Sequence, residues 1–499
     1  MFSISFGGVF MNKKLGVGMK ILSILLGALL GGFMWRCRGD GGWGSSWGLY
    51  AVGMVLMLLI YHFYSDRSGM KLEMIPFGAF LLGLGVTGYA TVIEQLGGVL
   101  WSDLPYVGCE ILNGQSPVSV GPNGDVNVPI DPVSGGIIIF IMGFTLVPLF
   151  TVFVTSLFSN KKYKLKDYVI ICVIFFAVSL VIRATVAHPI LKAINPEQVQ
   201  YAALGLKAYG HDYSSPMAAY MSHFMNRGWT QEIPFFENYY MSIEHISDAF
   251  GVLGISAYVL IKNKDKYTAF GSLIIDFFTA AATTALSPLI SCRYHAGPFA
   301  TVKPPEWFLR IADWGVWEFG TGFCFAFFLM TFLALTADRK NTVRTGFDDT
   351  PLFNDRKTSF AVNLVAFVFI FCVAPARVFG SRFAEVLETF KILPDKEPLA
   401  TILIVVGAIA LGIITLRILC RNILEKGGNA ADMLPVDFAK KALPIYMIFC
   451  FVCYFFMDDC EILYIKNDVT VPLMLITFAL IVLLYIPVRI KLRKSQGDR

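Results

Sequence analysis

The chain has 499 residues, of which 56% are hydrophobic and only 15% are charged, and its mean hydropathy is +0.63. Soluble proteins carry about 25% charged residues, so this composition excludes an ordinary soluble domain and indicates a membrane protein. The net charge of +5 is small and follows from the placement of the loops described next, so no nucleic-acid partner is expected.

Apolar runs of about 20 residues, long enough to cross a bilayer, recur along the whole chain. Each must be helical, because lipid offers no hydrogen-bond partner to the backbone. We therefore predict an all-α polytopic integral membrane protein, with residues 15–488 forming a single domain within the lipid bilayer. The predicted spans are 15–35, 48–64, 75–101, 135–159, 168–188, 247–262, 267–290, 316–336, 359–378, 399–420, 442–457 and 470–488, twelve transmembrane helices in all.

The distribution of basic residues predicts the orientation of these spans. With both termini cytoplasmic, the inner segments hold 25 of the 41 Lys and Arg residues, whereas the longer outer segments hold 13. The prediction is a multi-pass protein of the cell membrane with a cytoplasmic N-terminus at 1–14 and a basic cytoplasmic tail at 489–499. Met11 is followed by Asn-Lys-Lys and resembles a start, in which case residues 1–10 are a start-site artefact.

The outer loops 102–134, 189–246 and 291–315 are predicted to form an extracytoplasmic cap. The first is rich in turn residues, which is typical of a cap or a hairpin, and the second is typical of amphipathic helices at the interface. All eight tryptophans and five of the six histidines fall on this outer side, and only His62 lies on the inner side. An interfacial tryptophan belt would occupy both faces, so the asymmetry favours a site at the outer helix ends.

Three outer segments supply candidate site residues. The glycine-rich turn between the first two spans offers Arg and Trp side chains for binding an anion or a sugar ring, and Asp40 as an acid; the alternative is an ordinary interfacial turn. The segment 244–248 offers His245 and Asp248 as an acid–base pair. The alternative is that these residues only cap the start of a helix. The entry to the eighth span adds further basic and aromatic residues and Glu318. The candidate catalytic residues are Asp40, His245, Asp248 and Glu318, and the binding candidates in these segments are Arg36, Arg38, Trp43, Trp47, Arg293, His295, Trp314 and Trp317.

Ionisable residues at membrane depth are costly and usually face a cavity or a partner. Arg183 and His188 end the fifth span and Arg377 ends the ninth, so all three are binding candidates. An ion pair of Arg183 with Glu94 or Glu318 is the structural alternative. Asp276 lies near the middle of the seventh span, and with Glu94 it is a candidate for a proton relay. No complete metal-ligand spacing is present, and neither a metal nor a cofactor is expected.

The outer cysteines Cys37, Cys109, Cys292 and Cys460 allow a disulfide in an oxidising compartment, and buried free thiols are the alternative. The sequence gives no indication of oligomeric state.

Two functions compete. The first is a membrane enzyme with an outward site, a transferase acting on a lipid-linked or envelope glycan or another anionic substrate. In placing an acid, Asp40, just after the first span, the chain resembles polytopic glycosyltransferases, although its first outer loop is much shorter than theirs. The inner halves of the spans look almost entirely apolar, and this one-sided polarity favours the enzyme.

The second is a secondary transporter for a small polar or anionic solute. The segment Asp66-Arg67-Ser68-Gly69-Met70-Lys71 resembles the D-R-x-G-x-K core of the major facilitator signature loop, with His62 in place of the leading glycine. That family's long central cytoplasmic loop is absent, and after the eighth span only Asp338-Arg339-Lys340 resembles a second copy. The buried acid Asp276 favours this alternative.

Overall fold

The structure is a computed structural model, and it describes part of the chain. The described residues are 15–40, 45–68, 74–86, 119–120, 126–127, 132–208, 210–224, 234–293, 303–338 and 469–497, with scattered positions between 392 and 417. Nearly all of them lie in helices. The predicted spans 359–378 and 442–457 lie outside this part, and the span 399–420 is described only at scattered positions.

The helices of the first half are α1 (Val17–Asp40), α2 (Ser45–Ser68), α3 (Met74–Val86), α6 (Pro132–Phe144), α7 (Pro148–Leu157), α8 (Leu165–Thr185), α9 (Ala187–Ile194), α10 (Pro196–Ala208) and α11 (Pro216–Ser222). Those that follow are α13 (Pro234–Lys262), α14 (Lys266–Leu286), α15 (Pro288–Arg293), α16 (Glu306–Ile311), α17 (Trp314–Thr336) and α22 (Thr470–Gly497). Two short strands, β1 (Ser119–Val120) and β2 (Val126–Asn127), pair antiparallel within the loop predicted to form a cap or hairpin.

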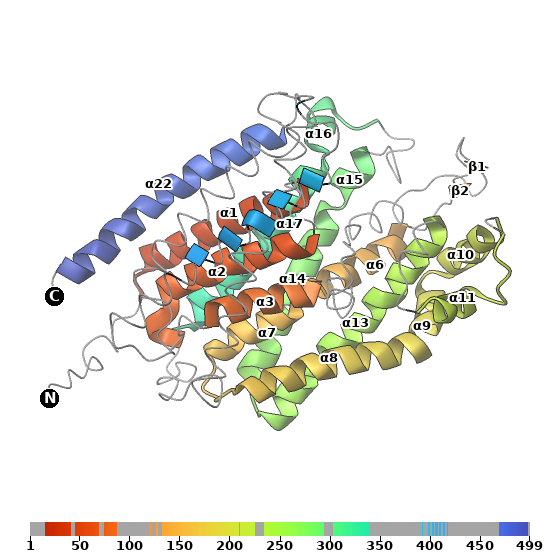
Figure 1. The fold of residues 1–499 in the computed structure, drawn as a ribbon, viewed down its shortest axis with the longest axis horizontal. Coiled ribbons are helices and arrows are strands. Elements are labelled where there is room, and N and C mark those ends of the chain that lie inside the picture. The colour runs from red at the N-terminus through yellow and green to blue at the C-terminus, as the bar shows by residue number, and fades with distance from the viewer. Residues whose placement is uncertain are drawn as a thin grey trace.

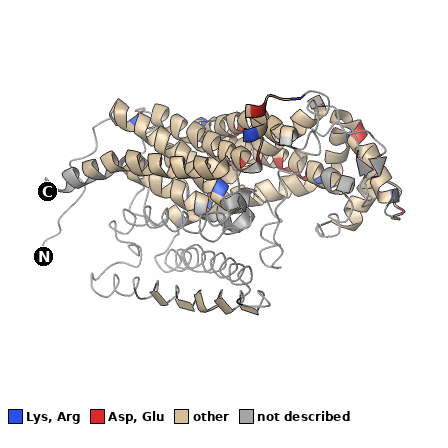
Figure 2. Ribbon diagram, turned by 90° about the horizontal axis from the view of Figure 1, so that it is seen from above, with Lys and Arg blue, Asp and Glu red and all other residues tan. Residues whose placement is uncertain are grey.

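Within the described residues, six helices are long and apolar enough to cross a membrane, and the bent pair α6/α7 would make a seventh. The six segments are Val17–Cys37, Leu165–Thr185, Tyr239–Lys262, Lys266–Leu286, Gly315–Thr336 and Thr470–Val488. Figure 2 shows how few charged residues interrupt these helices. The fold is therefore that of a helical protein with several membrane-spanning segments.

Helix α14 lies at the centre of the bundle, packed against α6, α7, α13 and α17. On one side of α14, α13 packs against α8. On the other side, α17 packs against α1, and α1 also contacts α2 and α22. Figure 1 shows α8 along one edge and α22 along the opposite edge. Helix α1 begins and α22 ends at one end of the bundle, which we call the terminal end. The short helices α9, α10, α11, α15 and α16 lie at the other end, which we call the short-helix end.

The contact between α1 and α17 depends on glycine. A Cβ atom at Gly322 would collide with the Trp35 Cβ and would lie 2.5 Å from the Gly31 carbonyl oxygen. A Cβ at Gly31 would meet Ala326 and lie 2.6 Å from the Gly322 carbonyl oxygen. Small residues let two backbones approach closely in a membrane, where dispersion contacts replace the hydrophobic effect as the driving force. The two helices therefore form a tightly packed pair.

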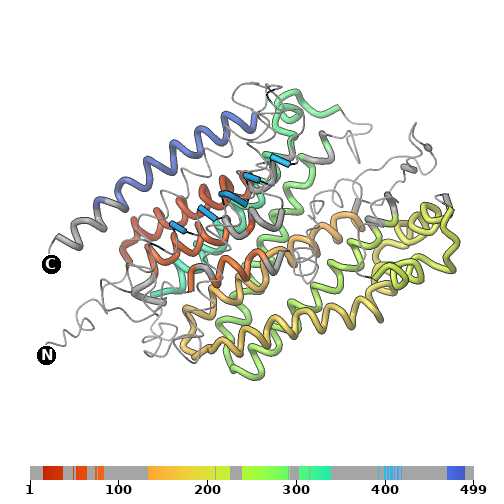
Figure 3. Tube along the Cα trace, in the orientation of Figure 1, coloured from red at the N-terminus to blue at the C-terminus, as the bar shows by residue number. Residues whose placement is uncertain are grey.

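The predicted span 135–159 is not one continuous helix. It divides into α6 and α7, which meet at an angle of 44° across residues 145–147 (Figure 3). Pro148 begins α7, and because proline has no N–H, the Phe144 carbonyl loses its usual helical partner four residues on. We call residues 145–147 the α6/α7 break.

Two other predicted spans also differ in extent. The predicted span 247–262 is short for a membrane crossing. In the structure it is the second part of the 29-residue helix α13, so the predicted start of this span is wrong. The fifth span ends at Thr185, and His188 lies in the separate helix α9 rather than at the end of the span. The polar residues before position 247 had hidden the continuation of α13.

Candidate functional site

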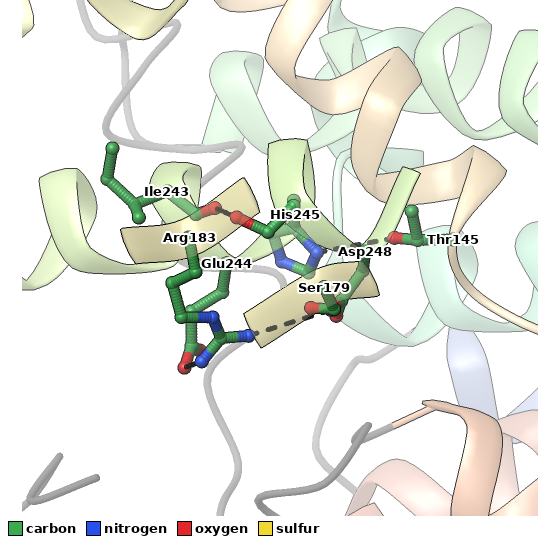
Figure 4. Close-up of polar contacts among 8 residues, drawn as sticks. Thr145, Ser179, Arg183, Ile243, Glu244, His245 and Asp248 are labelled. Carbon is green, nitrogen blue, oxygen red and sulfur yellow. Dashed lines mark hydrogen bonds and ion pairs between the residues drawn. The ribbon is translucent and has the colours of Figure 1, made fainter. Parts of the chain in front are cut away.

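The first group of site residues joins α8 to α13. Glu244 and Asp248 are four residues apart on α13 and therefore share one face, which packs against α8. Arg183 Nη1 on α8 donates to Glu244 Oε1 at 2.6 Å, and its Nη2 lies 3.5 Å from Asp248 Oδ1. Ser179, one turn before Arg183, donates its hydroxyl hydrogen to the same Asp248 oxygen. Figure 4 shows the arginine between the two acids.

His245 adjoins this group on the same turn of α13. Its Nδ1 lies 3.3 Å from the Thr145 hydroxyl oxygen, at the α6/α7 break. The Thr145 hydroxyl donates to the Met142 carbonyl at 3.0 Å, which leaves its oxygen to accept the Nδ1–H of His245. We call Ser179, Arg183, Glu244, His245 and Asp248 the Arg183 cluster; Thr145 links it to the break.

Charge and burial within the Arg183 cluster are unequal. The Arg183 side chain is only 1% exposed, whereas those of Glu244 and Asp248 are 11% and 15% exposed. One guanidinium faces two carboxylates, so the three side chains carry one surplus negative charge when all are ionised. A surplus charge at this depth is costly unless a proton or another cation balances it.

The second group joins α1 to α17. Arg36 Nη1 donates to Glu318 Oε2 at 3.0 Å, and the two side chains are 1% and 8% exposed. One positive charge here meets one negative charge. The expected pair of Arg183 with Glu318 does not form, because each arginine pairs with the acid on the helix packed against it; Glu94 lies outside the described residues. Trp317, beside Glu318, is buried in the core.

Asp276 is fully buried on the central helix α14. In the part of the chain that the structure describes, its partner is Thr151 on α7, whose oxygen lies 3.0 Å and 3.2 Å from the two carboxyl oxygens. The same Thr151 oxygen lies 3.0 Å from the Pro148 carbonyl oxygen. A hydroxyl has one hydrogen, so it cannot satisfy both acceptors fully. If Asp276 holds a proton it donates to Thr151, Thr151 donates to Pro148, and both contacts are satisfied.

A stripe of buried polar side chains runs along α14. Its members recur at helical spacing on one face and are Thr268, Ser272, Asp276, Thr279 and Thr283. On α7, Thr155 and Ser156 are also buried. The expectation that the inner halves of the spans are almost entirely apolar is therefore wrong for α7 and α14. The hydroxyls of Ser272, Thr279 and Thr283 bond to carbonyl oxygens of their own helix, which lets them lie in an apolar surrounding.

Two loops meet at the end of this stripe nearest the start of α14. Asp265 caps α14 by accepting from the Thr268 backbone N–H at 3.1 Å, and it also accepts from the Tyr163 hydroxyl at 2.8 Å. Burial and the neighbouring Asp265 carboxylate raise the pKa of Tyr163, so its hydroxyl remains a donor. The contact ties the loop after α7 to the start of α14.

His188 lies apart from the Arg183 cluster, on α9. Its Nδ1 is 2.7 Å from the Tyr239 hydroxyl oxygen. Partial burial, and then the neighbouring Lys192, lower the pKa of His188. The histidine is therefore a neutral contact between α9 and α13 at neutral pH.

The remaining predicted residues are only partly placed. Five of them lie in helices, but nothing is described of their side chains: Arg38, Asp40, Trp47, Arg293 and Trp314. Four others lie wholly outside the described residues: Trp43, Glu94, His295 and Arg377. Cys37 and Cys292 are buried, and Cys292 is a free thiol, whereas Cys109 and Cys460 lie outside the described residues. The described residues contain no group of three or more His, Cys, Asp or Glu side chains that could hold a metal ion.

Three contact residues were not anticipated: Ser179, Thr145 and Thr151. Ser179 could have been found, because it lies one helical turn before Arg183. Thr145 and Thr151 could not, because their roles depend on a break that an uninterrupted apolar run conceals.

Comparison of the chain with protein-family models, with curated proteins and with solved structures finds no match.

Proposed function

We propose that this chain is a secondary transporter for a small polar or anionic solute, driven by a cation that binds at Asp276. The observation that carries the proposal is this fully buried carboxyl group on the central helix, in contact with Thr151 just beyond a break in a neighbouring helix. Acids within the membrane are functional candidates, and transporter sites are typically built beside broken helices.

The polar stripe of α14 supports the same proposal. Alternating access needs polar groups on both sides of a central site. The stripe extends from Thr268 to Thr283, with Asp276 between them, so polar side chains occur on both sides of the acid. This distribution of polar groups supports transport over a site that is polar on one side alone.

The proposed topology has twelve spans, both termini in the cytoplasm and the short-helix end facing outward as a cap. The excess of basic residues in the predicted inner loops supports it. So does the placement of the start of α1 and the end of α22 at the same end of the bundle. The cell membrane is the proposed location.

A transferase with an outward site remains the second candidate. It is favoured by Arg36, Glu318 and Trp317 near the outer ends of α1 and α17, where a lipid-linked or envelope glycan could bind. The two arginines that are buried in the described part of the chain are already engaged by carboxylates, however, so an anionic substrate would have to displace an acid from Arg36 or Arg183. That exchange weakens the case for these arginines as a preformed anion site.

Reconstitution into liposomes tests the proposal. A panel of sugars, amino acids and organic anions is added outside vesicles that hold a pH-sensitive dye, under imposed proton and sodium gradients. We expect at least one solute to enter in a gradient-dependent way, and Asp276→Asn to abolish that coupling.

The matched control is Asp212→Asn, the same chemical change at an exposed position, which should transport like the parent protein. Gradient-driven uptake that survives in Asp276→Asn would exclude the proposed role of Asp276. If no solute in the panel enters while the purified protein turns over lipid-linked saccharides, the transferase replaces the transporter.

A further inference from the structure

We infer that the proton is the coupling ion, that the Arg183 cluster loads it from the outer side, and that the α6/α7 break passes it to Asp276. The inference rests on the proposed transport function and identifies its ion and its route. Its first support is the charge balance of the cluster: one arginine faces two acids, and a single proton on the cluster cancels the surplus negative charge.

The two ends of this route, the acids of the Arg183 cluster and Asp276, differ in how far their side chains are exposed. The Glu244 and Asp248 side chains are 11% and 15% exposed, and they lie in the first half of α13, so we assign the entry of the proton to this part of the route. Asp276 is 0% exposed and has no such access in this conformation. A proton that neutralises Asp276 must therefore arrive through other groups or through a rearrangement of the helices around it.

The break connects the two ends. Thr145 lies at its start and contacts His245 at 3.3 Å, and Thr151 lies one turn beyond it and contacts Asp276 at 3.0 Å. Pro148, between them, deprives the Phe144 carbonyl of its helical partner, which leaves a polar acceptor within the apolar layer. In net terms, the cluster gives up one proton, the Asp276 carboxylate gains it, and its negative charge is cancelled.

The groups around Asp276 suit a proton better than a metal cation. A metal ion prefers several oxygen ligands. In the described part of the chain, the oxygen that lies against the Asp276 carboxyl group is the Thr151 hydroxyl, a single ligand besides the carboxyl group itself. One carboxyl group and one hydroxyl make a complete site for a proton.

The helices packed against α13, the helix of His245, carry charged and titratable groups of their own. They are Lys166, Asp167 and Arg183 on α8, Lys266 and Asp276 on α14, His188 and Lys192 on α9, and Glu197 and Lys207 on α10. Of these, Arg183 belongs to the cluster. His188 contacts Tyr239 instead and serves as a control.

Infrared spectroscopy of the full-length protein in reconstituted membranes tests the route directly. The carbonyl band of a protonated Asp276 is the band that Asp276→Asn removes, and its shift on transfer to deuterated buffer measures the rate of proton exchange. We expect at least tenfold slower exchange in His245→Gln and in Thr145→Val, which each remove one member of the link.

In two matched control variants, proton exchange at Asp276 should be as fast as in the parent protein. Ser247→Ala removes a buried hydroxyl that donates to the Ile243 carbonyl oxygen of its own helix, and His188→Gln removes a histidine outside the cluster. A second readout is the pH at which the Asp276 band is half-formed when the outside is titrated. Asp248→Asn removes the surplus charge, so this midpoint should fall by about one unit, a tenfold loss of proton affinity.

Unchanged exchange in both His245→Gln and Thr145→Val would overturn the route. A band that is absent at every pH, or that responds to sodium rather than to pH, would overturn the choice of ion. Neither result would remove the transport function, which the liposome uptake measures separately.

Discussion

Two buried ion-pair groups in the described part of the molecule use the same chemistry in opposite ways. Arg36 and Glu318 match one charge with one charge, between two helices held together by close glycine packing. Arg183 faces two acids, and the histidine next to them contacts a broken helix. A matched pair in a rigid contact stabilises one conformation. A mismatched group beside a break can change its protonation state and its conformation together, which is what a coupled process requires.

The largest expected effect comes from breaking the matched pair. Arg36→Met leaves Glu318 as a buried carboxylate without its arginine, and this should lower the free energy of unfolding by about 3–5 kcal/mol. The double variant Arg36→Met/Glu318→Leu should regain most of that loss, because it removes both charges of the pair. Thermal unfolding in detergent measures both, and a single variant as stable as the double would contradict the matched-pair interpretation.

The acids of the Arg183 cluster should respond differently. Either Glu244→Gln or Asp248→Asn leaves one carboxylate for Arg183, so each alone should cost no more than about 1–2 kcal/mol, with Glu244→Gln the costlier because of its shorter bond. Removing both acids takes both carboxylates from a buried guanidinium and should cost more than the two single changes added together. Strictly additive single and double losses in unfolding experiments would show that the two acids do not share the arginine.

A smaller effect is expected from crowding the rigid contact. Gly322→Ala places a methyl group against Trp35 and the Gly31 backbone, and should lower stability by about 1–3 kcal/mol. Gly136→Ala on α6 is the matched control, since no atom lies within 4 Å of the added Cβ. Equal melting temperatures for the two variants would argue against close α1–α17 packing.

The smallest effect concerns His188, outside both groups. Its lowered pKa means that the folded state favours the neutral ring, so its contribution to stability is full above the unfolded pKa of about 6.5 and is lost as the pH falls through the lower folded pKa. The melting temperature should therefore fall more between about pH 7 and pH 5 in the parent protein than in His188→Gln. Parallel pH profiles for the two would exclude this contribution.

Much of the helical architecture followed from hydrophobicity, because a backbone in lipid has few options. The pairing of charges did not. Glu244 and Asp248 could be placed on one face from their spacing, but their partner depended on which helix lies next to α13, and loop sequences do not encode that. Asp276 was recognisable as a buried acid from its position alone. Its contact with Thr151 was not, because Pro148 acts on helix direction while leaving the apolar pattern unchanged.

The position of Arg183 also bears on how the protein is assembled. Among the six described spans, α8 and α22 are the most apolar and α13 is the least apolar. A segment carrying Glu244, His245 and Asp248 enters lipid poorly by itself. Among the described spans, α8 is the one that immediately precedes α13, so the arginine is already in the bilayer when the two acids emerge during synthesis. The same bond that joins the helices in the finished protein would thus help the more polar helix to insert.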